Sequence, residues 1–402
     1  MLSFKVIGIN DSPQPAFTDE VKEVIDGGKV FSGGLRHHEI VGDVLPDGAK
    51  WIDITVPLDN VFQQYRNVDG EIVVFASCDP LFFGFASTLQ REFPDAIIKV
   101  YPTFNSLQSL AHRIVMPYHD MTIVSLTGRP WNAFDAALIQ GKTKIGVLTD
   151  RQHTPAAIAA RMLQYGYVEY DMYVGEHLGN PDTERIASYS PEEAAATAFS
   201  SPNCLIIASN IFSFPNSHFS ITTGLPDNAF AILDGRPKMI TKMPIRLLSI
   251  QALGLDADSV LWDIGFCTGS ISIEAKRMYP TIDVVAFEIR EEGRKLMEEN
   301  TRRFRTPGIT AVIGDFMEQD VTAFPQPTSI FIGGHGGKIV PMVARVAQLL
   351  PKGGCVVMNS VSEHSRTLFI GACQMFGLSL VSCNSIQLND NNKIDIIKCV
   401  KQ

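Results

Sequence analysis

Two glycines and one glutamate in the second half of the chain have the residue types and the spacing of a pocket for an adenosine-containing ligand. Gly265 and Gly269 bracket a turn, and Glu288 follows Gly269 by nineteen residues. Glycines at such a turn let a ligand approach the backbone closely, which a Cβ atom would prevent. A carboxylate at the end of the next strand can accept hydrogen bonds from both hydroxyls of a ribose. The three residues therefore predict a nucleotide-type pocket.

The elements predicted around these residues have the order that such a pocket requires. The apolar run 259–264 predicts a buried strand, 271–278 predicts the helix after it, and 283–288 predicts the next strand. Asp315 follows a third predicted strand, where a polar group can bind an adenine amine. These signals fall at the carboxyl ends of successive strands, which is where open α/β sheets bind ligands.

The spacing of the glycines distinguishes two classes of ligand. A nicotinamide dehydrogenase requires the pattern G-x-G-x-x-G, so that a pyrophosphate can bind at a helix N-terminus. This chain has G-x-x-x-G, without the middle glycine. S-adenosylmethionine contains a sulfonium group and no pyrophosphate, so the pattern favours an S-adenosylmethionine-dependent methyltransferase. An NAD-dependent dehydrogenase, and glycines that serve packing alone, are the alternatives.

Length, charge and cysteine content narrow the class of protein. The 402 residues are 45% hydrophobic, which predicts two domains with large cores. The net charge of -9 has the wrong sign for a protein that binds nucleic acid through its phosphates. The chain has no run of eighteen apolar residues and no secretory pattern, so we expect a soluble, cytoplasmic protein that does not bind membranes.

No metal site or disulfide framework is predicted. The seven cysteines form no C-x-x-C pair and are odd in number. The adjacent His37 and His38 have no third ligand at a spacing suited to a metal ion. We interpret them as part of a polar loop.

Both halves of the chain alternate predicted strands and helices, which predicts an α/β fold throughout. In the C-terminal half, alternation with helices predicts parallel pairing of the strands at 259–264, 283–288, 309–313, 328–333 and 353–359. Two further strands, at 378–386 and 394–400, predict an antiparallel hairpin at one edge. The expected C-terminal fold is therefore a seven-stranded, doubly wound, Rossmann-like sheet.

The N-terminal half has different motifs and is therefore not a duplicate of the C-terminal half. Its strands are predicted at 3–9, 71–77, 97–101, 121–126, 144–148 and 203–209. The segment 210–220 is rich in Ser and Asn and is interpreted as the linker, although its phenylalanines indicate that it packs between the halves. The predicted domains are thus 1–210 and 211–402.

The motifs of the two halves together resemble a known family. The matching N-terminal segments are 76–84, 102–108, 125–129, 148–150 with 154–155, and 175–179 with 184–185. The matching C-terminal segments are 240–246, 265–269 and 332–337. Over nearly its whole length the chain resembles the decarboxylating precorrin-6Y methyltransferases of the cobalamin pathway, in which two different methyltransferase domains are fused.

The resemblance implies cofactor residues in each half. The N-terminal half is similar to the tetrapyrrole methyltransferases, which bind S-adenosylmethionine between two α/β lobes. By that likeness its cofactor cleft is lined by Gly8, Ile9, Ser77, Asp79, Ser106 and Leu107. Motif and strand ends together give the candidate cofactor residues of the C-terminal, Rossmann-like methyltransferase domain: Thr241, Asp263, Gly265, Phe266, Cys267, Thr268, Gly269, Glu288, Asp315 and Phe316.

The sequence departs from the family pattern at three places. The first loop, 8–13, lacks the later glycines of the family, and Cys78 replaces a glycine. These two departures keep open the alternative of a tetrapyrrole-binding carrier whose N-terminal half is inactive. His335 stands where the family usually has a serine, and no catalytic residue is assigned.

The reaction that the resemblance implies is a double methylation with decarboxylation. Two S-adenosylmethionine molecules would donate methyl groups to carbons 5 and 15 of a reduced corrin precursor, and the acetate on ring C would lose carbon dioxide. The N-terminal half would act at carbon 5, and the C-terminal half would methylate carbon 15 and decarboxylate. The parent families assemble as oligomers, so we also expect a homo-oligomer.

The substrate would be a small-molecule tetrapyrrole, which is large, flat and anionic. The glycine-rich segment 333–337 offers bare backbone to such an acceptor, so Gly334, His335 and Gly336 are candidate substrate residues. The substrate's carboxylates need cations. The candidate cations beside matching motifs are Arg36, Arg129, Lys242, Arg246 and Lys338, with Arg36 and Arg129 favoured.

Overall fold

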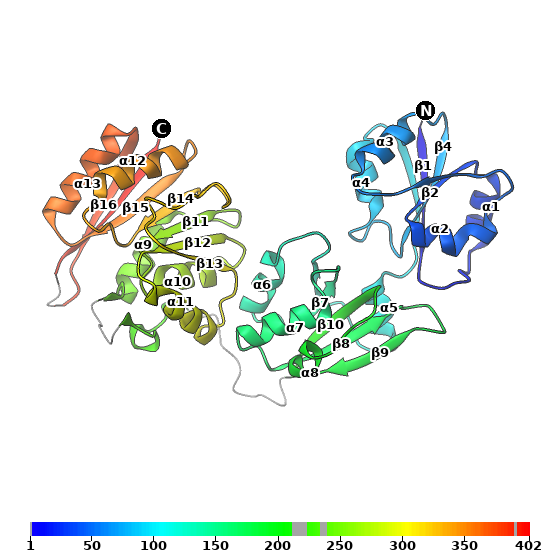
Figure 1. Ribbon diagram of the computed structural model, residues 1–402, viewed down its shortest axis with the longest axis horizontal. Coiled ribbons are helices and arrows are strands. Elements are labelled where there is room, and N and C mark those ends of the chain that lie inside the picture. Colours follow the sequence, from blue (N-terminus) through cyan, green and yellow to red (C-terminus); the bar gives the residue numbers. More distant parts are fainter. Residues whose placement is uncertain (1, 211–222, 234–238, 390–391) are drawn as a thin grey trace. The chain divides into compact units, whose positions relative to one another are not determined.

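The computed structural model describes residues 2–210, 223–233, 239–389 and 392–402. The chain divides into two compact units. Unit 1 comprises residues 1–129, 143–160 and 170–210, and unit 2 comprises 130–142, 161–169 and 211–402. Both units contain sheets with flanking helices, so the expected α/β class is confirmed (Figure 1). The domain boundary at 210 stays a prediction, because residues 211–220 of the proposed linker lie outside the described residues.

The first sheet of unit 1 is parallel and has the strand order β3-β2-β4-β1-β5. Its strands are β1 (Ser3–Ile9), β2 (Val30–Gly33), β3 (Lys50–Asp53), β4 (Glu71–Ser77) and β5 (Ile97–Tyr101). The helices are α1 (Asp19–Gly27), α2 (Leu35–Val41), α3 (Asp59–Arg66) and α4 (Phe85–Glu92), with the 3-10 turn η1 (Gly42–Val44). Ile9 and Ser77 are paired in register, so the carboxyl ends of β1 and β4 lie side by side.

The second sheet of unit 1 is mixed and has the order β6-β7-β10-β8-β9. Its strands are β6 (Thr122–Ser125), β7 (Lys144–Leu148), β8 (Tyr170–Glu176), β9 (Arg185–Tyr189) and β10 (Asn203–Ser209), and only the β6–β7 pair is parallel. The helix α5 (Ser106–Arg113) buries Leu107 and Leu110 against Cys204 and Ile206 of β10. The helix α8 (Pro191–Ala195) has a Ser190–Glu193 capping box at its start.

Four strands of unit 1 were not expected from the sequence. Strands β2 and β3 have only four residues each, which is too short to show an alternating pattern. Strand β9 is an edge strand without a fully buried residue. Strand β8 follows the helix α7 (Pro155–Gln164) after a turn, and Asp171 and Gly175 interrupt its apolar sequence.

The described residues of unit 2 form one sheet of seven strands, in the order β13-β12-β11-β14-β15-β17-β16. The strands are β11 (Val260–Ile264), β12 (Asp283–Glu288), β13 (Ile309–Ile313), β14 (Ser329–Ile332), β15 (Cys355–Ser360), β16 (Leu378–Ile386) and β17 (Ile394–Lys401). Pairing is parallel except for the antiparallel β15–β17 and β16–β17 pairs, so the expected edge hairpin is confirmed. Strand order reverses between β11 and β14, which makes this the topological switch point.

Helices cover both faces of this sheet (Figure 1). They are α9 (Met243–Leu253), α10 (Ser270–Met278), α11 (Glu292–Arg303), α12 (Ile339–Leu349) and α13 (Glu363–Met375), and the 3-10 turn η2 (Asp227–Ala229) precedes them. Trp262 and Phe287 face the core formed with α12 and α13, whereas Leu261 and Phe331 face α9 and α10. Because the side chains on both faces of the sheet are buried in this way, the parallel strands have nearly continuous apolar sequences.

Unit 2 also contains two segments from the N-terminal half. The helix α6 (Asn132–Ile139) presents Asp135, which is 1% exposed, to the guanidinium of Arg161 at 2.6 and 2.7 Å. Tyr167 donates a hydrogen bond to the carbonyl of Arg305 at 2.7 Å. None of the helices in the described ranges is long and apolar enough to cross a membrane.

Candidate functional site: a cofactor cavity in unit 2 and a polar cluster in unit 1

A cavity of about 700 Å³ opens in unit 2 where the carboxyl ends of parallel strands meet. Ile264 and Glu288 end β11 and β12, and Gly314 and Gly333 follow β13 and β14; all four line the cavity. The predicted residues that line it are Thr241, Lys242, Asp263, Gly265, Phe266, Cys267, Thr268, Glu288, Asp315, Phe316, Gly334, His335, Gly336 and Lys338. Gly269 is not among the lining residues.

The turn between β11 and α10 requires its glycines for reasons internal to the chain. Gly265 and Gly269 have φ values of +78° and +73°, which favour glycine. A Cβ atom on Gly265 would lie 2.6 Å from the nitrogen of Gly334, and one on Gly269 would lie 2.7 Å from the sulfur of Met297. Packing within the chain therefore already requires glycine at both positions. The close approach of a ligand to this turn stays a prediction.

Glu288 is a fixed carboxylate beside this turn. It is 2% exposed, and its Oε2 accepts a hydrogen bond from the backbone nitrogen of Cys267 at 2.9 Å. Its Oε1 accepts from the backbone nitrogen of Arg290 at 3.1 Å and from Nη1 at 3.2 Å. A carboxylate offers about four acceptor positions, so at least one is left for a ribose hydroxyl.

Asp263 has an unsatisfied oxygen in the cavity wall. Its Oδ2 accepts a hydrogen bond from Ser272 Oγ at 2.6 Å, whereas Oδ1 is buried and has no partner among the described residues. Burial raises the pKa of Asp263 to about 7; the hydrogen bonds from Ser272 oppose this shift, and the charge of Glu288 adds to it. A cationic ligand beside Oδ1 would satisfy this oxygen and favour its ionised form. The residues present therefore fit S-adenosylmethionine, which carries ammonium and sulfonium charges.

The remaining cofactor candidates contribute in different ways. Burial raises the pKa of the Cys267 thiol to about 11, so the thiol is protonated and is not a nucleophile at neutral pH. The pKa of Asp315 is lowered by Lys338, whose Nζ lies 2.8 Å from Asp315 Oδ2. Phe316 is 4% exposed and packs in the core as well as lining the cavity.

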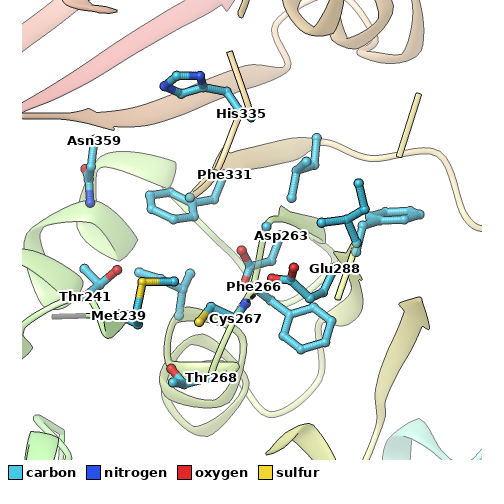
Figure 2. Close-up of a pocket in the computed structure, with 18 of the residues that line it drawn as sticks. Met239, Thr241, Asp263, Phe266, Cys267, Thr268, Glu288, Phe331, His335 and Asn359 are labelled. Atoms are coloured by element: carbon cyan, nitrogen blue, oxygen red, sulfur yellow. Dashed lines mark hydrogen bonds between the residues drawn. The ribbon is translucent and has the colours of Figure 1, made fainter. Parts of the chain in front are cut away.

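The glycine-rich segment after β14 forms another part of the cavity wall, and its Gly334 packs against Gly265. Figure 2 shows His335 and Asn359 on one side of Phe331, with Asp263 and Glu288 on the other. Burial lowers the pKa of His335, and its Nδ1 accepts a hydrogen bond from the nitrogen of Gly337 at 3.1 Å. His335 is therefore a neutral imidazole at neutral pH with its proton on Nε2.

Several lining residues were not anticipated from the sequence, including Met239, Arg290 and Asn359. Asn359 lies near the end of β15 and is hydrogen-bonded to Ser249 Oγ at 2.9 Å. Asn359 could have been predicted as a lining residue, because it is a polar residue near the carboxyl end of a strand. The sequence around Met239 shows no periodic pattern that would have indicated a site residue.

Arg246 was a candidate for binding substrate carboxylates, and that expectation is wrong. Its side chain is 0% exposed and donates to Glu274 Oε2 at 3.1 Å, Asp227 Oδ1 at 3.1 Å and the carbonyl of Thr241 at 3.0 Å. It also donates to the carbonyl of Leu225. Arg246 therefore ties the segment that contains Thr241 to α10. Lys242 stays a candidate; its side chain is 39% exposed and its Nζ lies 3.9 Å from Asp227.

The predicted cofactor residues of the N-terminal half fall on three elements of unit 1. Gly8 and Ile9 end β1, Ser77 ends β4 with Asp79 just beyond it, and Ser106 and Leu107 begin α5. A Cβ atom on Gly8 would lie 1.7 Å from the carbonyl oxygen of Cys78, so Gly8 permits close contact within the chain. The side chains of Ile9 and Leu107 are buried in apolar clusters, which leaves their backbone to contact a ligand.

Cys78, which replaces a glycine of the family pattern, adopts a glycine-like conformation. Its φ is +54°, and burial raises the pKa of its thiol to about 11. The backbone therefore follows the path of a glycine at this position. The thiol is protonated at neutral pH.

A polar cluster lies at the carboxyl ends of β1 and β4. Arg36 Nη1 donates to Asp11 Oδ1 at 2.5 Å, and Arg36 Nη2 lies 3.5 Å from Ser77 Oγ. His177 Nδ1 lies 2.9 Å from Asp11 Oδ2, and His37 Nε2 lies 3.0 Å from Ser77 Oγ. Asp11 and His177 were not predicted, although Asp11 lies two residues after the end of β1 and His177 directly follows the end of β8.

Arg129 and His38 have other surroundings. The guanidinium of Arg129 is exposed, donates to Ser125 Oγ at 2.6 Å and lies 5.1 Å from the ring centre of Phe83. His38 stacks on Trp51 with ring centres 4.0 Å apart. The described part of the chain contains no group of three or more His, Cys, Asp or Glu side chains that could hold a metal ion.

Comparisons with known proteins match both the whole chain and its second half. A family described as "Precorrin methyltransferase domain" matches residues 233–397. A precorrin-6Y C(5,15)-methyltransferase [decarboxylating] from Sinorhizobium sp is 29% identical over 378 residues, which are 94% of this chain and 89% of the relative. A cobalt-precorrin-6B C(15)-methyltransferase (decarboxylating) from Salmonella typhi is 30% identical over 188 residues, which are 42% of this chain and 93% of the relative.

A solved structure is also similar to part of the chain. It is described as a precorrin-6y C5,15-methyltransferase from Geobacter metallireducens, with 26% identity and a TM-score of 0.42. The match covers 46% of this chain and 100% of that chain. From the two sequence relatives and the matching domain, we conclude that this chain belongs to the family of the decarboxylating precorrin-6Y C(5,15)-methyltransferases.

Proposed function

We propose that this chain methylates carbons 5 and 15 of a precorrin-6Y-type corrin precursor and removes carbon dioxide from the acetate on ring C, in cobalamin biosynthesis. The N-terminal domain, 1–210, acts at carbon 5. The C-terminal domain, 211–402, methylates carbon 15 and decarboxylates. Family membership supports this function and supports neither a dehydrogenase nor a tetrapyrrole carrier.

The observation that carries the proposal is the cavity in unit 2, because the candidate cofactor residues and the candidate acceptor residues line one space. Glu288 accepts a hydrogen bond from a ribose hydroxyl of S-adenosylmethionine. The ionised Asp263 faces the positive charge of this ligand. The backbone at Phe266 to Thr268 contacts the adenosine. Asp315 and Phe316 would bind the adenine, and Thr241 would also contact the cofactor. S-adenosylmethionine, when bound, supplies an electrophilic methyl group on sulfur.

The chain's own contribution to methyl transfer is alignment and exclusion of water. Gly334, His335 and Gly336 line the same cavity, and their small or neutral side chains leave room for a flat acceptor. Alignment of two reactants lowers a barrier by on the order of 7–11 kcal/mol at best. For decarboxylation, the same cavity removes the acetate from bulk water, which disfavours the solvated carboxylate. Lys242 binds one of the remaining carboxylates at the cavity rim.

In the N-terminal half, the backbone of Gly8, Ile9 and Leu107 and the side chains of Ser77, Asp79 and Ser106 bind a second S-adenosylmethionine. Arg36 and Arg129 bind carboxylates of the substrate. A guanidinium has five N–H donors. Arg36 uses one on Asp11 and one on Ser77, so other donors are left for a carboxylate of the substrate. We also propose that the chain assembles as a homo-oligomer, which light scattering on a sizing column tests.

Calorimetric titration of the purified chain with S-adenosylmethionine tests the proposal. We expect a stoichiometry of two per chain and no binding of NAD. Binding of NAD in place of S-adenosylmethionine would identify a dehydrogenase. Binding of a tetrapyrrole without consumption of the methyl donor would identify a carrier.

A further inference from the structure

Asp11 in unit 1 connects two side chains that come from different sheets. One carboxylate oxygen accepts from Arg36 Nη1 at 2.5 Å, and the other lies 2.9 Å from His177 Nδ1. Asp11 follows β1 of the first sheet, whereas His177 follows β8 of the second. The Asp11 side chain is 10% exposed, so the two contacts hold it in one orientation.

The contact with Asp11 determines which nitrogen of His177 carries the proton. A carboxylate paired with an arginine only accepts hydrogen bonds, so Nδ1 of His177 donates to it. In the neutral imidazole, Nε2 then has a lone pair. Among the described residues, none forms a hydrogen bond to Nε2 of His177. The side chain is 25% exposed, which leaves this lone pair accessible.

His177 also has a strained backbone. Its φ is +50°, a left-handed conformation that is uncommon for residues other than glycine. The backbone nitrogen of His177 donates to the carbonyl of Pro202 at 2.9 Å, which holds this conformation. Strained residues of this kind often occur at functional sites.

The second histidine of the cluster cannot accept a proton in the same way. The backbone nitrogen of Gly34 donates to His37 Nδ1 at 3.3 Å, so the proton of His37 is on Nε2, which donates to Ser77 Oγ. Both of its nitrogens are therefore used. Burial, with the charge of Arg36 beside it, lowers the pKa of His37 to about 4.

His177 is connected to the proposed cofactor residues through short contacts. Asp11 follows Ile9 by two residues, and Arg36 links Asp11 to Ser77. Gly179, two residues after His177, lies so near Asn10 that a Cβ atom would be 2.7 Å from its side-chain nitrogen. The imidazole thus lies at the carboxyl ends of β1 and β4, where the proposed carbon-5 reaction would occur.

We propose that His177 is the general base of the N-terminal half, with Asp11 and Arg36 as positioning residues. This inference depends on the proposed function. When carbon 5 is methylated, an electron pair of its double bond forms the new bond to the methyl carbon, and the bond from sulfur to that carbon breaks with its pair left on sulfur. The carbon–hydrogen bond then breaks, its electron pair restores the double bond, and the proton goes to Nε2 of His177. The carboxylate of Asp11 stabilises the resulting imidazolium.

His177→Ala tests the proposal because carbon 15 provides an internal control in the same chain. We expect the rate of methylation at carbon 5 to fall about 100-fold to 10,000-fold, the usual contribution of a general base. Methylation at carbon 15 and decarboxylation stay within about 2-fold of the original chain, and the stoichiometry remains two S-adenosylmethionine molecules per chain. Added imidazole, which fits the space left by the side chain, restores the carbon-5 rate at least about 10-fold.

The matched control is His119→Ala, which removes an exposed histidine of unit 1 and leaves both rates unchanged. A carbon-5 rate in His177→Ala within about 3-fold of the original would overturn the proposal. A loss of the carbon-5 rate that imidazole does not restore would also overturn the proposal, as would the loss of one cofactor site. Either of these two results would assign His177 a structural role. If the original chain itself adds only one methyl group, the proposed function fails instead.

Discussion

Three carboxyl groups that line the cavity of unit 2 have different environments, although each lies at or near a strand end. Asp263 is buried with one unsatisfied oxygen and has a raised pKa. Glu288 is equally buried but accepts two backbone hydrogen bonds. Asp315 is paired with Lys338, which lowers its pKa. A cationic ligand would therefore change the ionisation of Asp263, whereas two backbone groups hold the Glu288 side chain in place.

Glu288→Gln should weaken S-adenosylmethionine binding at one of the two sites. The substitution keeps the shape of the side chain but removes its charge, and hydrogen bonds to charged groups contribute about 1.5–3 kcal/mol. We expect the dissociation constant of the C-terminal site to rise about 10-fold or more, measured by calorimetry, with the second site unchanged. Glu291→Gln, at a 75% exposed side chain, is the control. Two unaltered sites in Glu288→Gln would contradict the assignment.

At the scale of elements, the turn between β11 and α10 and the segment after β14 depend on each other. Gly265 at φ +78° leaves no room for a side chain beside the nitrogen of Gly334. A change in one segment therefore displaces the other. Since one segment contacts the cofactor and the other the acceptor in the proposed mechanism, both functions of unit 2 depend on this packing.

Gly265→Val should abolish methylation at carbon 15 and decarboxylation while sparing carbon 5. A β-branched residue at positive φ is strained, and its Cβ would lie 2.6 Å from the Gly334 nitrogen. Product analysis by NMR measures the three reactions. Gly371→Ala, in α13 with no neighbour within 4 Å of the added atom, is the control and keeps all three. Equal loss at both carbons would argue against the division between the halves.

Arg246→Met should destabilise unit 2 because it leaves the carboxylate of Glu274, which is 0% exposed, without its counter-charge. Removing one partner of a buried ion pair costs about 3–5 kcal/mol of unfolding free energy. Urea denaturation of the whole chain measures the change. Arg294→Met, which breaks an exposed pair with Glu291, should change it by less than about 0.5 kcal/mol. A loss below about 1 kcal/mol for Arg246→Met would show that Glu274 is satisfied without the guanidinium.

The elements of the C-terminal half were predicted more completely than those of the N-terminal half, for physical reasons. All seven strands of unit 2 lie within two residues of the expected bounds, because long apolar runs mark parallel strands covered on both faces. Strands β2 and β3 have four residues each and carry no such signal. The pairing of Asp11 with His177 joins residues 166 positions apart, which no local pattern reveals.

At the scale of the whole molecule, the two units place polar groups at the same kind of position with different architectures. In unit 1, Asp11 and Ser77 lie at the carboxyl ends of β1 and β4 of a parallel sheet that is accompanied by a mixed sheet. In unit 2, Asp263 and Glu288 lie at the ends of β11 and β12 of one doubly wound sheet. The chain has a net charge of -9, so the anionic substrate that we propose would need local cations, for which Arg36 and Lys242 are the candidates.

Mass spectrometry of the product made with an isotopically labelled methyl donor tests the central claim most directly. Incubation of the whole chain with a precorrin-6Y-type substrate should give a product that has gained two labelled methyl groups and lost one carbon dioxide. A product with a single labelled methyl group, or one that keeps all of its carboxylates, would contradict the account.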